Sequence, residues 1–225
     1  MSAIKDYLKI ALSGLTILLF IPFLYLAGDK NKPPRQRLSN IILKILGVKP
    51  KIIGAQNPNT TMFIINHQSV LDIVVIEAIS STNFCWIAKT ELFNLPLFGH
   101  LFKSCKMIGV DRDSKQGLIK LIKDSKNAIE NNRPLVIFPE GTRSKDDRLL
   151  EFKPGAKIIA EKLTLKVQPI VIVDSAKLVD TKHSVTSAGG ELKVIYMEPL
   201  DINKKGWLEE AREAMQKRLD EERAK

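Results

Sequence analysis

The sequence predicts an α/β fold, a mixed sheet flanked by helices, preceded by an apolar two-helix segment at the N-terminus. Three observations predict this fold class. Beyond residue 50, short runs of β-branched residues alternate with longer helical patterns, as in a sheet covered by helices. Two apolar segments of helical character stand before residue 50. The 225 residues are 44% hydrophobic, which fits one domain and excludes a disordered chain.

The first predicted helix is the uncharged run of 19 residues from 10 to 28. As a helix it would be roughly 28 Å long, about one hydrocarbon thickness. Lys5 and Lys9 precede it as in a signal peptide, but no small-residue cleavage site with a polar mature start follows. Pro22 would kink a helix, so a shallow re-entrant helix and a full span are both open.

The second predicted helix follows the helix breaker Pro33-Pro34. Its apolar residues recur at helical spacing on one face, at Leu38, Ile41, Ile42, Ile45 and Leu46. Three cations stand nearby to meet anionic headgroups, Arg35, Arg37 and Lys44. A helix packed on the core of the domain would show the same pattern. The position behind an apolar, basic-flanked segment favours the membrane, so the two helices together are predicted to be membrane-binding.

The net charge of +10 is concentrated at the N-terminus. Residues 1–51 hold nine basic and two acidic side chains around apolar sequence, which indicates an anionic membrane surface and no nucleic acid partner. We expect residues 1–50 to form membrane-associating helices and residues 51–225 to form the main domain. Because the cations after the apolar run outnumber those before it, this domain should lie on the cytoplasmic face of the cell membrane.

Six runs rich in β-branched and aromatic residues predict the strands. They read TMFIIN, FCWIA, MIGV, LVIF, QPIVIV and LKVIYM, at residues 61–66, 84–88, 107–110, 135–138, 168–173 and 192–197. Longer segments between and after them show helical periodicity, at 70–79, 96–103, 115–131, 155–163 and 207–223. The 115–131 segment, for example, turns Leu118, Leu121 and Ile122 inward and a stripe of charged side chains outward.

The string NHQSVLD stands where a predicted strand passes into a predicted helix. If Ser69 caps that helix, Asp72 stands three residues later in the relation of a capping box. His67 then lies outside the helix, where Asp72 can accept a hydrogen bond from one imidazole nitrogen and leave the other free as a base. This spacing alone leaves open a capping aspartate beside a loop histidine that has no partner.

The string FPEGTRS also follows a predicted strand. Pro139 and Gly141 favour a tight turn, and Gly141 and Thr142 offer backbone N–H groups. Arg143 adds a planar fork of donors, a combination that suits a phosphate monoester. Glu140 could hold Arg143 in place or take a substrate hydroxyl. A plain turn with a surface arginine is the alternative that the string alone leaves open.

Other catalytic chemistries lack their usual patterns. Ser69 is not within a Gly-x-Ser-x-Gly elbow, so a serine hydrolase is not indicated. Cys85 and Cys105 provide no disulfide framework and are expected to be small buried hydrophobic residues in a reduced compartment. The three histidines fall in unrelated contexts without ligand spacing, so no metal site is expected at His67, His100 or His183.

Four ordered blocks of the sequence resemble the motif blocks of one enzyme family. They are NHQSVLD, then KTELFNLPLFGHLFKSCKMIGVDR at 89–112, then FPEGTRS, then VQPIV at 167–171. In this order they resemble the 1-acylglycerol-3-phosphate O-acyltransferase family, also called lysophosphatidate acyltransferases. The apolar N-terminus looks like that of bacterial members. The resemblance implies that residues 51–225 form an acyltransferase domain.

The resemblance also implies a reaction. A fatty acyl chain would move from acyl-CoA or acyl carrier protein to the 2-hydroxyl of 1-acylglycerol 3-phosphate, forming phosphatidate in phospholipid synthesis. His67 would be the base and Asp72 its partner, with no metal and no bound cofactor. Substrate contacts would come from Lys89, Arg112, Glu140, Gly141, Thr142 and Arg143. Acylation of another lysolipid head group and a non-catalytic module that binds anionic lipid are the alternatives.

Overall fold

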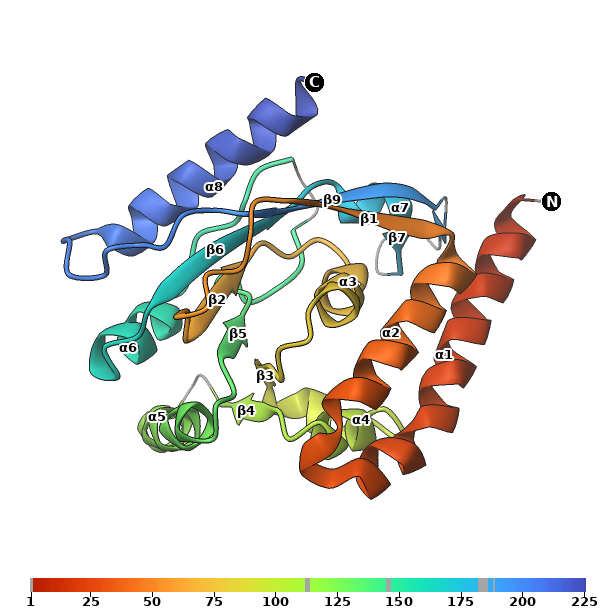
Figure 1. Ribbon diagram of the computed structural model, residues 1–225, viewed down its shortest axis with the longest axis horizontal. Coiled ribbons are helices and arrows are strands. Elements are labelled where there is room, and N and C mark those ends of the chain that lie inside the picture. The colour runs from red at the N-terminus through yellow and green to blue at the C-terminus, as the bar shows by residue number, and fades with distance from the viewer. Residues whose placement is uncertain (1, 112–113, 145–146, 182–185, 188) are drawn as a thin grey trace.

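The computed structural model describes residues 2–111, 114–144, 147–181, 186–187 and 189–225. Within these ranges a seven-stranded sheet forms the centre, in the order β1-β9-β6-β2-β5-β3-β4 (Figure 1). Neighbouring strands are parallel except β6 and β9, which are antiparallel. The strands are β1 (Val48–Ile53), β2 (Met62–Ile65), β3 (Cys85–Lys89), β4 (Ile108–Val110), β5 (Leu135–Ile137), β6 (Val167–Ile172) and β9 (Gly190–Tyr196). The short strands β7 (Val179–Asp180) and β8 (Thr186–Ser187) pair separately, and the predicted mixed α/β sheet is confirmed.

Helices cover both faces of the sheet (Figure 1). In the described chain they are α1 (Ser2–Ala27), α2 (Lys32–Leu46), α3 (Leu71–Ile79), α4 (Gly99–Ser104), α5 (Lys115–Glu130), α6 (Pro154–Lys162), α7 (Ser175–Leu178) and α8 (Trp207–Arg223). Two 3₁₀ turns, η1 (Gly28–Lys30) and η2 (Thr90–Asn94), complete them. Helices α1, α2 and α3 pack on one face, and α5, α6 and α8 pack on the other.

The sheet separates two hydrophobic clusters because successive side chains of a strand point to opposite faces. Strand β2 shows this alternation. Met62 and Ile64 join the cluster with α5, α6 and α8, whereas Phe63 and Ile65 join the cluster with α2 and α3. All four side chains are completely buried, so β2 is a central strand covered on both faces, and its carboxyl end opens into the interior of the domain.

The six predicted strands correspond to β2, β3, β4, β5, β6 and β9, with ends that differ by one or two residues. Strand β1 was not predicted, because its sequence VKPKII interleaves lysines with apolar residues and contains Pro50. Such a strand is tolerated at the edge of a sheet, and β1 is an edge strand. Strand β1 spans residue 50, after which the domain boundary was predicted. That boundary stays a prediction.

The two N-terminal helices lie side by side, with α2 between α1 and the domain (Figure 1). Helix α1 continues through Pro22, and its part Ile4–Ala27 is the one described helix long and apolar enough to cross a membrane. Helix α2 instead buries Leu38, Ile42 and Leu46 in the cluster with α3. The prediction that this apolar face meets the membrane is therefore wrong, and the alternative of a helix packed on the core holds.

A buried ion cluster explains why α2 packs on the domain. The Glu77 carboxylate of α3 accepts a hydrogen bond from Lys32 Nζ at 2.7 Å, and Arg35 Nη1 lies 3.5 Å from its other oxygen. Arg35 also donates to Asn83 Oδ1 at 2.6 Å and is 3% exposed, so it does not meet a headgroup as expected. Burial lowers the pKa of Lys32, while the Glu77 charge raises it. The two cations at the start of α2, Lys32 and Arg35, therefore bind side chains of the domain.

This cluster predicts an unequal cost for removing two glutamates. Glu77→Ala should lower the free energy of unfolding by about 3 to 5 kcal/mol, because it leaves buried cations without their counterion. Glu191→Ala is the matched control, since Glu191 and Lys51 form an ion pair whose side chains are both more than half exposed. Its loss should cost about 0 to 1 kcal/mol. Denaturant unfolding in detergent measures both, and equal costs would contradict the assignment of the cluster.

Candidate active site

His67 and Asp72 meet at the carboxyl end of β2, in the loop that leads into α3. His67 Nδ1 lies 2.9 Å from Asp72 Oδ2. The same oxygen accepts hydrogen bonds from the backbone N–H groups of Gln68 at 2.8 Å and Ser69 at 2.9 Å. A carboxylate is an acceptor only, so Nδ1 carries the proton and Nε2 is the basic nitrogen. The predicted pairing of this histidine with this aspartate is present.

The loop before α3 supports the pairing, although Val70 and not the predicted Ser69 is the N-cap residue of the helix. Helix α3 is assigned from Leu71, and Ser69 Oγ accepts a hydrogen bond from the Leu71 N–H at 3.1 Å. The Ser69 N–H donates to Asp72 Oδ2, which is one half of a capping box, while the Asp72 N–H donates to the Ser69 carbonyl and not to its hydroxyl. His67 stands outside the helix, which lets its ring turn back onto a carboxylate five residues later.

The His67 ring lies at the wall of a cavity of about 340 Å³. It stacks on the Phe138 ring with centroids 3.8 Å apart and an interplanar angle of 11°. The Trp86 ring also packs against the Phe138 ring, with ring centroids 5.6 Å apart. The rest of the lining is mainly apolar, with Val70, Ile73, Ile87, Leu92, Phe102 and Met107. The cavity therefore combines a base with a surface that suits a lipid chain.

Four of the residues predicted to contact substrate line this cavity together with His67: Lys89, Gly141, Thr142 and Arg143. They come from two segments, because Lys89 ends β3 and the other three follow β5. Arg143 Nη1 donates to Thr181 Oγ1 at 3.3 Å, and among the described residues neither Arg143 nor Lys89 forms an ion pair with a carboxylate. The two cations are thus available to an anionic group in the cavity. Arg112 lies outside the described residues.

Gly141 has a more local role than the one predicted for it. Its N–H donates to the Phe138 carbonyl at 3.0 Å and closes the turn. Its φ of 73° lies in the left-handed region, which glycine adopts without a steric penalty. Gly141 therefore turns the chain after β5 so that Thr142 and Arg143 face the cavity.

Glu140 was expected to line the acceptor site, but the structure places it behind the cavity wall at 1% exposure. Its Oε1 accepts the His67 N–H at 2.7 Å, and its Oε2 accepts the Leu150 N–H at 2.8 Å. The Ser144 N–H donates to the His67 carbonyl at 2.8 Å. The turn after β5 thus holds the His67 backbone from both sides. Burial raises the pKa of Glu140 to about 7, although the N–H groups of Leu150 and His67 lower it.

Sequence reasoning missed three side chains that build the site. Asn66 bonds the backbone of Ile172 twice, through Nδ2 at 2.9 Å and Oδ1 at 2.7 Å, and so ties the end of β2 to β6. Phe138 supports the imidazole face, and Trp86 supports Phe138. Asn66 is the first residue of the string NHQSVLD, and Phe138 is the first residue of FPEGTRS. Their places in these two motifs could have identified them as site residues. Nothing in the sequence distinguishes Trp86.

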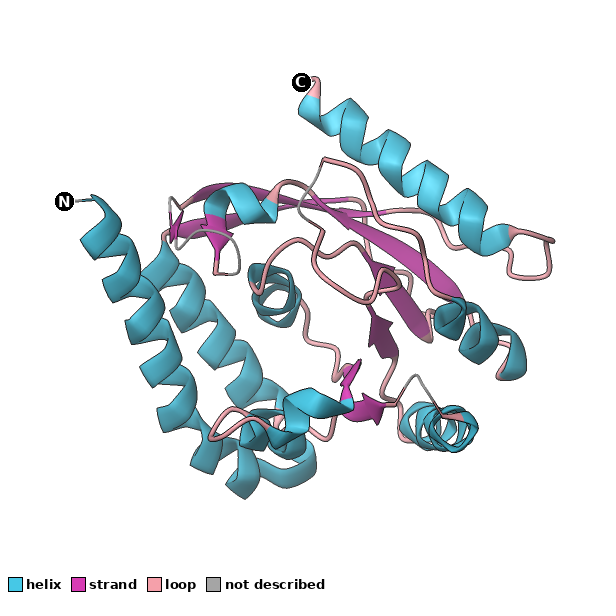
Figure 2. Cartoon of the chain, turned by 180° about the vertical axis from the view of Figure 1, so that it is seen from behind, coloured by secondary structure: helices cyan, strands magenta, loops and turns pink. Residues whose placement is uncertain are grey.

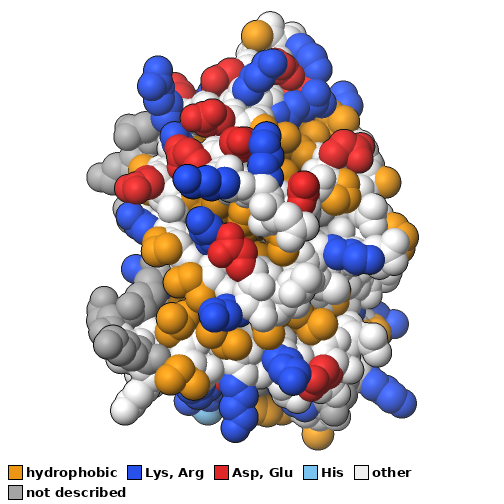
Figure 3. Space-filling view, turned by 90° about the vertical axis from the view of Figure 1, so that its left-hand side faces the viewer, with side chains coloured by type: hydrophobic (Ala, Val, Ile, Leu, Met, Phe, Trp, Pro, Cys, Tyr) orange, Lys and Arg blue, Asp and Glu red, His pale blue; other side chains and the backbone are white. Residues whose placement is uncertain are grey.

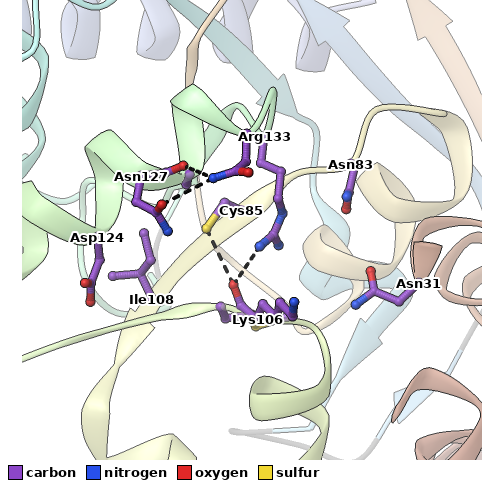
Figure 4. A pocket seen from close by; sticks show the side chains of 11 residues that line it. Asn31, Asn83, Cys85, Lys106, Ile108, Asp124, Asn127 and Arg133 are labelled. Atoms are coloured by element: carbon purple, nitrogen blue, oxygen red, sulfur yellow. Dashed lines mark hydrogen bonds between the residues drawn. The ribbon is translucent and has the colours of Figure 1, made fainter. Parts of the chain in front are cut away.

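The two cysteines are buried, and burial raises the pKa of both thiols, which makes them poor nucleophiles. Cys85 borders a polar cavity of about 480 Å³ at the opposite ends of the strands (Figure 4). There Arg133 and the Cys85 thiol both bond the Lys106 carbonyl. That cavity shares one lining residue, Met107, with the His67 cavity. The expectation that no metal is bound stays a prediction.

A third cavity, of about 510 Å³, borders the His67 cavity through Ile87 and Phe138. It lies between α5 and α6 and is largely apolar, with Leu118, Leu121 and Ile158 in its wall. Figure 3 faces the side of the molecule that carries these two helices, and hydrophobic side chains gather there between charged ones. Two apolar cavities thus lie on opposite faces of the sheet next to one base.

Comparison with known proteins gives four findings. Residues 51–173 match the family model described as Acyltransferase. The 1-acyl-sn-glycerol-3-phosphate acyltransferase of Helicobacter pylori strain J99 is 40% identical over 219 residues, which are 96% of this chain and 91% of that protein. The protein of the same name from Cocos nucifera is 32% identical over 88% of this chain and 64% of its own length. The crystal structure of the acyltransferase PlsC from Thermotoga maritima has the same fold, with a TM-score of 0.81 at 21% identity over 100% of this chain and 97% of that one.

The position of Glu140 predicts a pH-dependent stability. Its pKa is about 7 in the folded protein against 4.5 for an ordinary glutamate, so the folded state binds the proton more tightly. The contribution of Glu140 to the free energy of unfolding is therefore fully present below pH 4.5 and is lost as the pH rises through 7, by about 3 kcal/mol. Glu140→Gln, which does not titrate, removes this dependence. Denaturant unfolding of both proteins at pH 5 and pH 8 measures it, and a difference that is the same at both pH values would contradict the burial of this carboxyl.

Proposed function

Because the chain belongs to the acyltransferase family and is a 1-acyl-sn-glycerol-3-phosphate acyltransferase, we propose that it moves a fatty acyl chain from acyl-CoA or acyl carrier protein to the 2-hydroxyl of lysophosphatidate. The product is phosphatidate, a precursor in phospholipid synthesis. The observation that carries the proposal is the His67 and Asp72 pair, 2.9 Å apart, at the wall of a cavity that also presents Lys89 and Arg143.

The reaction follows from the protonation of the pair. His67 Nε2 takes the proton of the acceptor hydroxyl while the hydroxyl oxygen bonds to the thioester carbonyl carbon. Asp72 stabilises the imidazolium through Nδ1, which it already holds as a donor. As the tetrahedral intermediate collapses, the carbon–sulfur bond breaks and His67 returns the proton to the thiolate. The acceptor hydroxyl is itself the nucleophile, so no acyl-enzyme forms.

The acceptor phosphate is proposed to lie against Arg143, Lys89 and Thr142. Arg143 offers a bidentate fork, and Lys89 adds a second cation from the end of β3. Arg112 is proposed as a further phosphate contact from the resemblance alone. Glu140 contributes to this site through the His67 backbone that it holds, and Gly141 closes the turn and also lines the cavity, where its contact with the substrate stays a prediction.

The location of the enzyme follows from α1, an apolar N-terminal helix that indicates membrane association. One stripe of α1 is exposed, with members three or four residues apart: Ile4, Leu8, Leu12, Leu15, Leu19, Phe23 and Leu26. We propose that this stripe lies in the cell membrane and that the catalytic domain is on the cytoplasmic face. Exposed Lys5 and Lys30 near the two ends of α1 then meet anionic lipids, whereas Lys32 and Arg35 are buried in the domain.

The first test of the mechanism is the loss of the base. His67→Ala should lower the rate of thiol release from acyl-CoA in the presence of lysophosphatidate by at least about 10²-fold, with little change in acceptor affinity. Asp72→Asn should also lose activity, because an amide can hold the wrong tautomer. His100→Ala is the control, since His100 is exposed and lies outside the cavity lining. Near wild-type turnover of His67→Ala would refute the mechanism, and faster thiol release with a lysolipid of another head group than with lysophosphatidate would favour that acceptor.

The second test concerns the phosphate contact. A charged hydrogen bond contributes about 1.5 to 3 kcal/mol, so Arg143→Ala should raise the KM for lysophosphatidate about 10- to 100-fold. Arg143→Lys should recover only part, because an ammonium keeps the charge but loses the fork. Monoacylglycerol lacks the phosphate, so it should be a poor acceptor that either substitution affects far less. Equal fractional losses on both acceptors would mean that Arg143 is structural.

A further inference from the structure

We propose that the turn at residues 95–98, between η2 and α4, inserts its tip into the lipid bilayer as a second membrane contact beside α1. The inference rests on the membrane location in the proposed function and adds a segment that the charge and hydropathy of the N-terminus do not reveal. The occupant of this surface is the bilayer itself, in the layer where acyl chains meet headgroups.

The tip of the turn exposes large apolar side chains. Leu97 is 62% exposed, Leu95 is 45% exposed and Phe98 is 38% exposed, and Pro96 between them is exposed as well. Four consecutive apolar residues on a protruding turn are unusual for a surface in contact with water. Single exposed residues such as Ile119 on α5, at 68%, are ordinary, but a contiguous group is not.

The turn is also rigid, so the apolar tip is built and not a collapsed loop. The Gly99 N–H donates to the Leu95 carbonyl at 2.9 Å, and the His100 N–H donates to the Leu97 carbonyl at 3.1 Å. A Cβ on Gly99 would lie 2.3 Å from the Phe93 carbonyl oxygen, so the backbone is closely packed there. Leu97 has a φ of 60°, a left-handed conformation that costs energy for a bulky residue. The fold accepts this strain and still presents a leucine to the outside.

The turn continues the apolar surface of α1. The ring of Phe98 reaches the backbone of Gly14, where an added Cβ would lie 3.9 Å away, and Tyr25 Oη is 3.2 Å from His100 Nδ1. Figure 2 shows the loop before α4 reaching across to the C-terminal half of α1. Gly14 and Tyr25 lie on the flank of α1 next to its exposed stripe. A bilayer that receives the stripe is therefore adjacent to the turn.

Charge supports the bilayer over another protein surface. Exposed Lys103 and Lys106 follow the turn in sequence, and no acidic residue stands between residues 92 and 110. When an apolar tip enters the acyl-chain region of a bilayer, nearby cations can bind the anionic headgroups above it. Residues on either side of the turn, Lys89, Leu92 and Phe102, line the active-site cavity. Insertion would thus hold one wall of that cavity at the level of the headgroups.

Depth-dependent fluorescence quenching tests the proposal. Leu97→Cys in the full chain is labelled with bimane, since both natural cysteines are buried, and is added to vesicles of phosphatidylcholine and phosphatidylglycerol that carry brominated acyl chains. The Leu97 label should lose most of its fluorescence. Ile119→Cys is the matched control at similar exposure on α5 and should be unaffected. Equal fluorescence of the two labels, whether low or high, would overturn the proposal.

Partitioning gives an independent reading. Leu97→Asn removes the apolar side chain at a φ that asparagine tolerates, so the fold should be kept. It should weaken binding of the full chain to the same vesicles about tenfold, as expected for withdrawing a half-exposed leucine from the bilayer. Ile119→Asn should leave binding unchanged. An unchanged partition of Leu97→Asn, or a monomer–dimer shift in place of a partition change, would overturn the proposal. Neither measurement uses turnover, so a failure of the proposed acyl transfer would be seen separately, in thiol release by the wild type.

Discussion

One buried carboxylate oxygen, Asp72 Oδ2, is the point on which the site depends. It accepts the backbone N–H groups of Gln68 and Ser69 and the ring N–H of His67. The bonds from Gln68 and Ser69 hold the loop that leads into α3. The bond from His67 sets the tautomer of the base. The start of a helix is a favourable place for a negative charge, since its free N–H groups and dipole point there. Helix formation and orientation of the base are therefore a single arrangement, and neither can be altered without the other.

The parallel sheet supplies the remaining geometry. Strands β2 and β5 are neighbours in register, with Ile64 opposite Ile137, so the residues that follow them emerge side by side. The turn after β5 can then reach the His67 backbone with Glu140 and Ser144 and its ring with Phe138. On the other side, Asn66 is bonded to β6. A base held by its ring, its backbone and its preceding residue loses little entropy when it reacts, which is what a preorganised site requires.

The N-terminal helices are connected to this site through Glu77. Its carboxylate binds Lys32 of α2 and also accepts the Trp86 indole N–H at 2.7 Å. Trp86 packs on Phe138, which stacks on His67. Contacts therefore run without interruption from the helix pair that carries the exposed apolar stripe to the imidazole. The enzyme holds its base at a fixed position relative to the exposed apolar stripe of α1, and the buried charges of this connection are costly to desolvate.

The sequence by itself determined the α/β class and six strands of the sheet, because strand periodicity is local and needs no partner elsewhere in the chain. The pairing of His67 with Asp72 was predicted from the four ordered motif blocks, since their spacing alone left an unpaired histidine open. The sequence also indicated that Arg143 and Lys89 would share a site. Only the tertiary structure decided whether an amphipathic helix meets water, lipid or the core. The sequence of α2 is compatible with all three, and its contact with the buried Glu77 places its apolar face on the core. Likewise FPEGTRS does not say which way Glu140 points. Its carboxylate turns inward because two backbone N–H groups, one of them from His67, require an acceptor once strands far apart in sequence have been brought together.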